Sequence, residues 1–577
     1  MADQKTSPDI TNVTTTNSPL RESPSGASTT ESPSNPPLDP LNILEIEDPT
    51  PRSKRRTTGI LVALFLVLFT TALDQTITAT SIPVITSSLH SAAGYTWIGS
   101  AYLLANAFSG PIWARLSDIF GRKPALLSSV SLFGIASILA ATSSSMRMLI
   151  AARALQGVAS GGIGGLVYIT ISDLFSMRRR ALVFGSLGGV WAVAGCTGPV
   201  LGGALTGLGT SGMAEGWRWC FWINVPICTL ALILISFLLD VHNPRTDIRK
   251  GLAALDWPGT LSIISVTLLL LLGLEFGGTV FPWNSAQVLS LLILGSIMVL
   301  FFIFSEKRLA RYPLIPMTLF TQRATLAAFT VAFAHGMVSF GVEYYLPLYF
   351  QSVRQASPLR SGILVLPMMV TEASTDILAG VYLHRVGRYR EITWVGVVLM
   401  TLGTGLYILV TRTTAVGPII AIQITSGIGV ALLFQTPVLA IQNTVAQGET
   451  AAATATVGFM RNLATSFSIV VGGVVFRHGM DGQQGFLAGM GIPEDVLGLL
   501  TGENAAANVG VVKGLEDPVQ RAAVQDAFSG SLRNMFIFYT AVAAVGLVGG
   551  GFITQREMSR EHVETKTGVD MLKEREG

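Results

Sequence analysis

Residues 114–126 read Ala114-Arg115-Leu116-Ser117-Asp118-Ile119-Phe120-Gly121-Arg122-Lys123-Pro124-Ala125-Leu126. An apolar run long enough to cross a lipid bilayer lies on each side of this stretch. Gly121 permits a tight turn between the two runs, and Asp118, Arg122 and Lys123 make that turn charged. The stretch therefore predicts a turn between two membrane spans that acts as a latch, binding a neighbouring helix in one conformation and releasing it in another.

The composition of the chain indicates a membrane protein with many spans. Of its 577 residues, 50% are hydrophobic and 13% are charged, whereas soluble domains carry about 25% charged residues. The net charge is only +3 and the cations lie in short loops, which argues against a nucleic-acid partner. Cys196, Cys220 and Cys228 form neither a disulfide framework nor a metal-ligand pattern. The sequence carries no Walker loop or nucleophile elbow, so we expect neither an enzyme nor a cofactor.

The first part of the chain, residues 1–56, differs from the rest. Ser, Thr and Pro dominate it, and such a segment cannot bury enough apolar surface to offset the entropy lost on ordering. We therefore expect a disordered tail. Four cations directly precede the first span, which favours a cytosolic location for this tail. They are Arg52, Lys54, Arg55 and Arg56.

Apolar runs of about 20 residues recur along the remaining chain and predict fourteen membrane spans in an all-α membrane protein. We divide them into a six-span half at 57–240, two inserted spans at 256–306 and a second six-span half at 324–555. Residues 478–533 are expected to form an extracellular loop with short interfacial helices, and residues 556–577 a cytosolic tail. The spans are placed near 59–83, 95–115, 124–143, 148–171, 182–206, 219–239, 257–276, 286–305, 325–350, 359–383, 391–411, 416–438, 450–476 and 534–554.

A degraded copy of the charged turn occurs at residues 380–390, Gly-Val-Tyr-Leu-His-Arg-Val-Gly-Arg-Tyr-Arg. His384 stands where the first copy has its aspartate, whereas Arg385, Gly387 and Arg388 match the first copy. The first copy follows the second span, so in a chain of two successive six-span halves the second copy would follow the eighth. It follows the tenth predicted span here, which places two additional spans between the halves. An even number of spans places most loop cations on one side, which fits two cytosolic termini.

Four elements of the sequence resemble motifs of the major facilitator superfamily. The charged turn is similar to that family's loop between spans two and three, although Ala114 and Ile119 stand where the family has a glycine and a basic residue. The strings Leu73–Pro83, Gly198–Gly203 and Trp217–Pro226 are similar to elements of its fourteen-span drug:proton antiporters, in particular of fungal pumps for mycotoxins and other secondary metabolites. The resemblance implies two six-helix halves that alternate access to a central cavity.

Two charges deep in the N-terminal half are candidates for proton coupling. Asp74 lies in the first span, where a carboxylate is costly and therefore functional by default. It could carry a proton, contact substrate, or serve as a hydrogen-bonding partner in the bundle. The resemblance assigns Arg153 of the fourth span to proton coupling, and the alternative is an arginine that extends to the membrane interface.

Two further groups are expected to act in conformational change. The latch comprises Asp118, Gly121, Arg122 and Lys123 with Arg385, Gly387 and Arg388 of the second copy. Its alternative is an ordinary positively charged loop. By resemblance, Gly198, Pro199, Gly202 and Gly203 form the element typical of antiporters. A packing kink alone is the alternative for this element.

Four more charges in or beside the spans are candidates for a cavity: Glu343, Glu372, Asp376 and Arg461. Glu372 and Asp376 are four residues apart on one helix face, so they could share a proton or face one cavity. A structural hydrogen bond or an interfacial position is the alternative for each. The sequence does not tell which aromatic residues line such a cavity.

The sequence thus predicts a proton-coupled exporter of small amphipathic organic molecules, which by resemblance are toxins, drugs or secondary metabolites. Its partners would be the small-molecule substrate, protons and the lipid bilayer, and we expect a monomer without metal. The plasma membrane is the expected location, with a vacuolar or vesicle membrane as alternative. An uptake carrier for siderophores or other small solutes and a non-transporting membrane sensor are the alternative functions.

Overall fold

Long apolar helices carry the fold in the computed structural model, which describes residues 53–91, 94–207, 215–278, 280–501, 504–562, 565, 567–569 and 571. Residues 54–577 belong to one unit, and the description concerns that unit. Of the predicted disordered tail, 1–56, residues 1–52 lie outside the described residues, whereas Lys54, Arg55 and Arg56 already belong to helix α1.

The helices follow one another with short connections. In chain order they are α1 (Lys54–Ser88), α2 (Gly94–Phe120), α3 (Arg122–Ala141), α4 (Met146–Leu174), α5 (Met177–Thr206), α6 (Trp219–Trp222), α7 (Asn224–Leu238), α8 (Ile248–Ala253), α9 (Trp257–Phe276), α10 (Ala286–Phe304), α11 (Arg323–Ser352), α12 (Pro358–Val386), α13 (Tyr389–Leu406), α14 (Val416–Gln442), α15 (Thr450–Gly482), α16 (Gln484–Gly489), α17 (Glu494–Leu499), α18 (Asn504–Ala507), α19 (Val511–Gly514) and α20 (Pro518–Gly551).

Short polar side chains fix where several long helices begin. The first backbone N–H groups of a helix have no partner within the helix, and a Ser or Asp oxygen before the first turn accepts from them. Such capping bonds begin α4, α9, α10, α12 and α20. The capping residues are Ser145, Asp256, Ser285, Ser357 and Asp517.

Thirteen of the described helices are long and apolar enough to cross a membrane by length and composition. The 27-residue helix α2 is not among them, although it packs against α4, α9 and α15 inside the bundle. Because protein surrounds much of α2, it accommodates small and polar residues such as Asn106 and Ser109, which lipid would disfavour. With α2 included, the helices fit the predicted fourteen spans and the all-α membrane fold.

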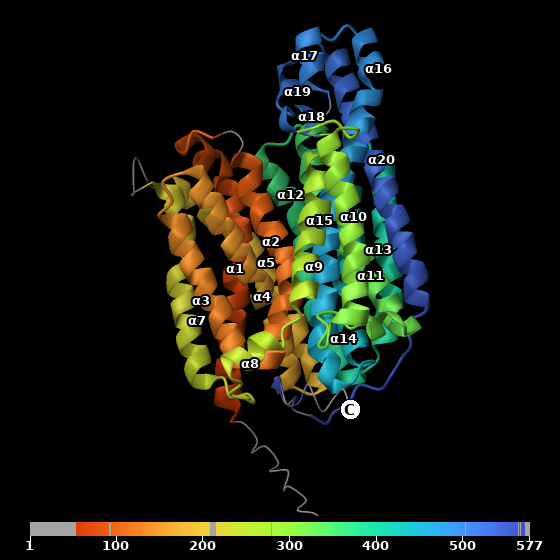
Figure 1. Cartoon of the computed structure of the whole chain (residues 1–577). Coiled ribbons are helices and arrows are strands. Elements are labelled where there is room, and N and C mark those ends of the chain that lie inside the picture. Colours follow the sequence, from red (N-terminus) through yellow and green to blue (C-terminus); the bar gives the residue numbers. More distant parts are fainter. Residues whose placement is uncertain are drawn as a thin grey trace, which may run out of the picture. The chain divides into compact units, whose positions relative to one another are not determined.

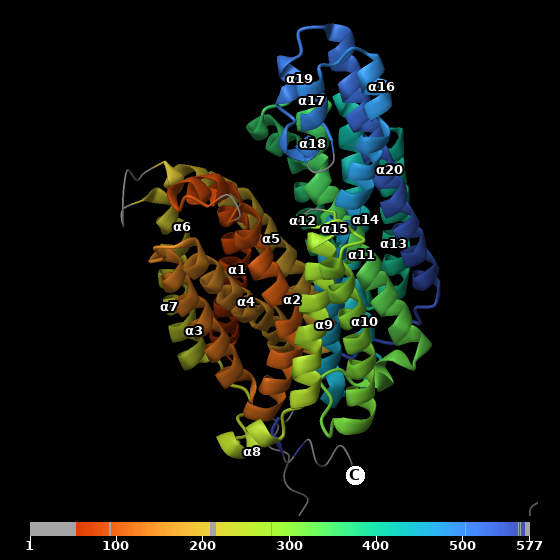
Figure 2. The same ribbon diagram turned by 45° about the horizontal axis from the view of Figure 1, so that its top comes forward.

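Two groups of helices flank a central region (Figure 1). The first group holds α1 to α7 and the second holds α11 to α15 with α20, and Figure 2 shows the same separation after rotation. The inserted pair, α9 and α10, packs through α9 against α2 of the first group and α15 of the second. The additional spans therefore lie beside the seam between the groups.

The two ends of the bundle differ. We call the end where α1 begins and residues 553–562 lie the tail end, and the end that carries α16 to α19 the loop end (Figure 1). The long loop is shorter than the predicted 478–533, because α15 continues to Gly482 and α20 begins at Pro518. The prediction counted only apolar residues, whereas polar and amphipathic turns extend both helices beyond their apolar runs.

Glycines allow the closest helix crossing of the first group, between α2 and α4. A Cβ atom on Gly157 would lie 2.2 Å from the Tyr102 carbonyl oxygen, and one on Gly161 would lie 2.0 Å from Ser109 Oγ. Gly165, on the same helix, has nothing within 4 Å of its Cβ position. The spacing of four residues thus sets a close contact for the first two glycines only.

We predict that Gly157→Ala destabilises the protein by about 1–3 kcal/mol, the usual cost of overpacking a filled interior. The backbone carbonyl of Tyr102 must move to admit the methyl group. Thermal unfolding of the purified chain in detergent measures the effect. Gly165→Ala is the matched control and should be neutral or stabilising, since alanine favours helix; equal unfolding temperatures for the two variants would contradict the prediction.

Candidate functional site

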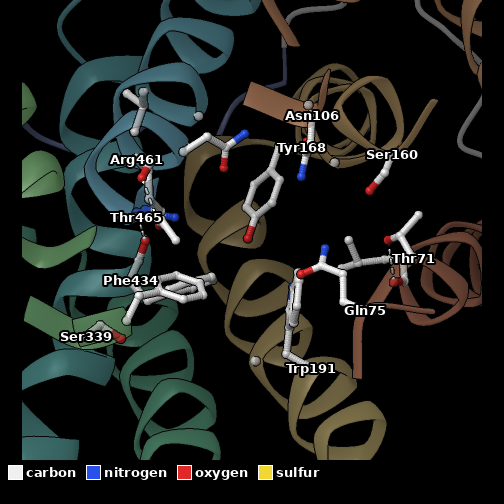
Figure 3. Close-up of a pocket in the computed structure, with 18 of the residues that line it drawn as sticks. Thr71, Gln75, Asn106, Ser160, Tyr168, Trp191, Ser339, Phe434, Arg461 and Thr465 are labelled. Carbon is white, nitrogen blue, oxygen red and sulfur yellow. Dashed lines mark hydrogen bonds between the residues drawn. The ribbon is translucent and has the colours of Figure 1, made fainter. Parts of the chain in front are cut away.

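A cavity of about 360 Å³ lies between the two groups of helices. Figure 3 shows side chains from both groups facing the same space, with Gln75, Tyr168 and Trp191 opposite Phe434 and Arg461. The walls combine aromatic rings, glycines and a few polar groups, which is typical of sites for small organic ligands. Polar and aromatic lining residues include Thr71, Gln75, Asn106, Ser160, Tyr168, Trp191, Ser339, Phe340, Glu343, Glu372, Asp376, Phe434, Arg461, Asn462 and Thr465.

Three of the predicted cavity charges are carboxyl groups on the wall formed by the second group. Glu343 of α11 and Glu372 of α12 lie close enough for their carboxyl groups to act on each other, and Ser339 Oγ donates to Glu343 Oε1 over 3.2 Å. Asp376 lies one turn further along α12, against Gly188 of α5, where a Cβ would lie 2.1 Å from Asp376 Oδ2. The structure therefore brings together the three acids that the sequence proposed for one cavity.

Arg461 of α15 is the cation of this wall. Its guanidinium stacks over the ring of Phe434, with 4.6 Å from Cζ to the ring centroid, and Nη2 donates to the Phe434 carbonyl oxygen over 2.7 Å. No ion pair within 4.0 Å joins Arg461 to an acid among the described residues. The Arg461 guanidinium lines the cavity and is available there to bind an anionic or polar group of a ligand.

Asp74 and Arg153 form an ion pair behind the cavity wall. Arg153 Nη1 lies 2.5 Å from Asp74 Oδ2, while Gln156 Nε2 and Asn224 Nδ2 donate to Asp74 Oδ1 over 3.1 and 2.8 Å. The Asp74 side chain is 0% exposed, and Arg153 is 2% exposed. Arg153 therefore points into the bundle, and the Asp74 carboxylate has three donors.

Tyr102 connects this ion pair to the cavity. The Arg153 guanidinium lies over the Tyr102 ring, 4.4 Å from the centroid. Tyr102 Oη donates to Ser160 Oγ over 2.6 Å and accepts from Gln75 Nε2 over 3.3 Å. Ser160 and Gln75 both line the cavity (Figure 3). A ligand that displaces either residue thus acts on the surroundings of the ion pair.

The latch residues bind α2, α3 and α4 together at the tail end. Arg122 Nη1 lies 2.7 Å from Asp118 Oδ1, and Arg122 Nε lies 2.7 Å from Asp173 Oδ2 at the end of α4. Gly121 adopts φ = 97°, a left-handed conformation that favours glycine. Lys123 Nζ donates to the Ser236 carbonyl oxygen of α7 over 2.7 Å. The turn therefore clamps four helices of one group.

The second copy of the turn differs from the first. Gly387 again has a left-handed φ, of 74°, and ends α12. Arg385 contributes its carbonyl oxygen, which accepts from Arg178 Nη1 over 3.2 Å, and Arg388 pairs with Glu391 at the surface over 3.3 Å. The copy thus keeps the backbone turn and lacks the buried arginine of the first.

C-terminal residues cross the tail end and contact both groups. Arg178 Nε donates to the Met558 carbonyl oxygen over 3.2 Å, and the Gly568 N–H donates to the Asp118 carbonyl oxygen over 2.8 Å. The C-terminal segment is therefore attached to the latch itself. Further hydrogen bonds join Asn443 to Arg556, Gln447 to Thr565 and His242 to Thr567.

The glycine element of α5 packs against α1. A Cβ on Gly198 would lie 2.0 Å from Thr76 Oγ1, and one on Gly202 would lie 2.2 Å from Thr80 Oγ1. Pro199 and Gly203 lie on the exposed side of α5, which continues as one helix through the proline. Two of the four predicted residues therefore make a close helix contact.

Several residues of the site were missed by the sequence analysis. Asp173 completes the latch, yet a single acid at a helix end gives no signal without its spatial partner. His335, fully buried with its ring 5.8 Å from that of Phe434, stands in an apolar run and could have been noted there. The aromatic lining residues carry no recognisable pattern, because cavity and core aromatics look alike in sequence.

The chain is similar to known transporters over most of its length. A family model described as Major Facilitator Superfamily matches residues 64–469. The MFS-type transporter ppz2 of Metarhizium majus is 42% identical over 530 residues, covering 92% of this chain and 90% of that protein. The efflux pump dotC of Dothistroma septosporum is 41% identical over 517 residues, covering 90% and 87%.

The fold is also that of solved transporters. The proton:xylose symporter XylE aligns over 91% of this chain and 99% of its own with a TM-score of 0.55, and its 14% identity makes this a likeness of fold alone. The named relatives move solutes, so the prediction that the chain is a transporter and not an enzyme is confirmed. The chain belongs to the Major Facilitator Superfamily, in its fungal group of MFS-type transporters and efflux pumps.

Proposed function

We propose that the protein is a proton-coupled efflux transporter of small amphipathic organic molecules. The observation that carries this proposal is the cavity between the two groups, with three carboxyl groups and one arginine on a wall otherwise rich in aromatic rings. Aromatic and glycine surfaces suit flat or bulky apolar bodies, and the few charges suit a polar or ionised end. The efflux pump dotC, similar over 90% of the chain, supports the direction.

The tail end is assigned to the cytosol. Cations cluster where helices begin or end at the tail end. Because cytosolic loops of membrane proteins carry an excess of Lys and Arg, this clustering indicates the cytosolic side. Both termini then lie in the cytosol, and the plasma membrane is the proposed location of a monomeric carrier. The clustered cations are Arg122, Lys123, Arg178, Arg179, Arg180, Arg385, Arg388 and Arg390.

The two groups meet at the tail end. A Cβ on Gly380 of α12 would lie 2.8 Å from the Ala181 carbonyl oxygen of α5, and one on Gly185 would lie 2.9 Å from Gly380 Cα. Ala114 of α2 packs against Ala451 at the start of α15. We therefore assign this conformation to the step in which the cytosolic side is closed and substrate leaves outward.

The contact between Glu343 and Glu372 supplies the proton site of the proposal. Two ionised carboxylates this close in a buried wall would repel each other, so the pair is suited to hold one proton. On the outward-open side the acids take a proton, and on the cytosolic side an arriving substrate with a donor or cationic group displaces it. Inward proton flow then drives outward substrate flow.

The pair of Asp74 and Arg153 has a second role in the same proposal. Tyr102, Ser160 and Gln75 link it to the cavity wall. If substrate binding shifts α1 relative to α4, the ion pair between Asp74 and Arg153 weakens. The pair would then break and form again in each conformational cycle. The ion pair thus couples occupancy of the cavity to the position of the helices.

Transport in liposomes tests the function directly. The full chain is reconstituted with its tail end facing outward, and rhodamine 6G is added outside. We expect the dye to accumulate inside only when the interior is acidic, and a protonophore to abolish this. Accumulation without a gradient would contradict coupling, accumulation only with an alkaline interior would indicate uptake, and no movement of any dye or solute would indicate a sensor.

We predict that Glu372→Gln lowers gradient-driven export by at least about tenfold, equivalent to roughly 1.4 kcal/mol, while downhill exchange persists. Glutamine keeps the shape and hydrogen bonds of the side chain but cannot release a proton. Initial dye fluxes with and without a pH gradient measure the ratio. Glu391→Gln, which alters an exposed acid at the tail end, should behave like the unchanged protein.

We predict that Asp74→Asn with Arg153→Gln lowers the response to the pH gradient by about tenfold. Each single variant leaves one buried charge unpaired and should lose about 3–5 kcal/mol of stability, so the double variant, which removes both charges, separates coupling from folding. Dye export and unfolding temperature are measured together. A stable double variant with a full gradient response would assign coupling to Glu343, Glu372 and Asp376 alone.

We predict that Gly380→Ala weakens closure of the tail end, because the added methyl group meets the α5 backbone. The readout is labelling of Ala451→Cys, which is 2% exposed in the closed state, in a chain whose exposed Cys196 is serine. Labelling from the tail side should accelerate severalfold. Gly362→Ala, on the same helix with nothing within 4 Å, is the matched control; equal rates in both variants would refute the role of Gly380.

A further inference from the structure

Two buried carboxyl groups lie outside the cavity, where the inserted helices meet at the tail end. Asp256 precedes α9, and Glu306 lies in the π-helical turn η3 (Ser305–Leu309) that follows α10. Asp256 is 6% exposed and Glu306 is 5% exposed. Neither residue forms an ion pair within 4.0 Å in the described part of the chain.

Each carboxyl group uses one oxygen for a backbone contact and leaves the other without a partner. Asp256 Oδ1 accepts from the Gly259 N–H over 2.9 Å, and Glu306 Oε2 accepts from the Ile315 N–H over 3.2 Å. Asp256 Oδ2 and Glu306 Oε1 are buried and have no hydrogen-bond partner. Each group is therefore held in place by one oxygen while the second oxygen is available to a ligand.

The two unpartnered oxygens face the same point. A Cβ on Gly259 would lie 1.9 Å from Asp256 Oδ2 and 2.8 Å from Glu306 Oε1. Any residue with a side chain would occupy the space between the carboxyl groups, so glycine keeps this space open. Two carboxylates turned toward one small enclosed space repel each other unless a positive charge or a proton lies between them.

The surrounding charges do not neutralise both acids. The charged groups that act on Glu306 are Asp256 and Arg115 of α2, and Arg115 also lies 3.7 Å from Asp118 of the latch. Tyr312, a titratable residue that follows the turn η3, packs against Leu255, the neighbour of Asp256 in the chain. Arg115 is thus shared between Glu306 and Asp118, and Asp256 has no ion pair within 4.0 Å among the described residues, so a proton in the pair would offset the remaining repulsion.

We propose that Asp256 and Glu306 form a proton-binding site in which one proton is shared between their facing oxygens, directly or through one water molecule. A neutral carboxyl group donates the hydrogen bond that the other, ionised group accepts, and both orphaned oxygens are then satisfied. The ligand is a proton taken up from the tail side, where the neighbouring Lys307 and Arg308 are exposed.

The site is mechanically linked to the latch. Arg115 Nη2 donates to the Pro313 carbonyl oxygen, and the Ile315 N–H, two residues further, donates to Glu306. The segment 313–315 is therefore held from one side by the latch helix and from the other by the acid pair. Loss of the shared proton makes the two acids repel, moves Glu306 away from this segment and loosens the contact with Arg115.

Infrared spectroscopy of the purified full chain in lipid tests the site without any transport. One component of the neutral-carboxyl C=O stretching band, identified in the difference spectrum against the unchanged protein, should be lost from Glu306→Gln and equally from Asp256→Asn, because an amide N–H then takes the place of the shared proton. The contribution of Glu343 and Glu372 should remain in both variants. Asparagine also caps helices, so α9 is preserved. Asp247→Asn is the matched control, since Asp247 is an exposed cap of α8, and the component should persist there.

Three results of this experiment would overturn the proposal. Persistence of the whole band in both variants would show that the acids bind no proton. Loss in Glu306→Gln alone would assign the proton to Glu306 without sharing. Stabilisation of the unchanged protein by NaCl over choline chloride, absent in both variants and without this component of the carboxyl band, would identify a cation site instead.

The effect on the latch rests on the proposed function and has a separate readout. Labelling of Ala451→Cys from the tail side should accelerate severalfold when the tail-side pH is raised, and this pH response should be lost in Glu306→Gln and Asp256→Asn but kept in Asp247→Asn. If the infrared spectra show the shared proton but Glu306→Gln and Asp256→Asn keep the pH response of labelling, the link between this site and the latch is refuted. Failure of proton-driven export would leave the infrared result unaffected.

Discussion

The burial of charge inside a helix bundle in lipid is the constraint on which the arrangement of this protein depends. Because an unpaired ion within a bilayer is costly, each deep charge needs a partner, a cavity or a proton. Asp74 has Arg153, Gln156 and Asn224. Arg122 has Asp118 and Asp173. The acids of α11 and α12 have the cavity instead, and this difference separates groups that hold the fold from groups that can exchange a ligand.

Close approach of backbones is the second requirement. Helices that carry their polar groups inward must pack tightly elsewhere, and glycines provide the space where α2 crosses α4 and where α5 meets α12. The first contact lies within one group and the second lies between the groups. A carrier needs both kinds: the contact within a group keeps it rigid, while the contact between groups must form and break without large side chains in the way.

The sequence predicted the fold far better than the site. Apolar runs and the repeated turn were sufficient for the helices, the two halves and the inserted pair, since each is a local pattern. The polar residues of α2 are explained only by its neighbours in the structure, because protein and not lipid surrounds much of this helix. The sequence proposed Glu343, Glu372 and Asp376 as cavity charges, but it gave a physical reason for proximity only to the two acids on one helix. The partnerships of Arg122 with Asp173 and of Asp256 with Glu306 join residues about 50 positions apart, which no single-sequence pattern contains.

The distribution of partners also suggests how work is divided between the halves. The N-terminal half holds the Asp74 carboxylate with three donors, so protonating Asp74 would weaken several bonds at once. The C-terminal half holds Glu343 and Glu372 against each other with a single serine donor to Glu343. Adding or removing a proton there would, in the proposed function, change few other contacts, so the two states would differ little in energy. In the proposed function the C-terminal half exchanges the proton, whereas the strongly held Asp74–Arg153 pair of the N-terminal half gives way only when substrate shifts α1 relative to α4.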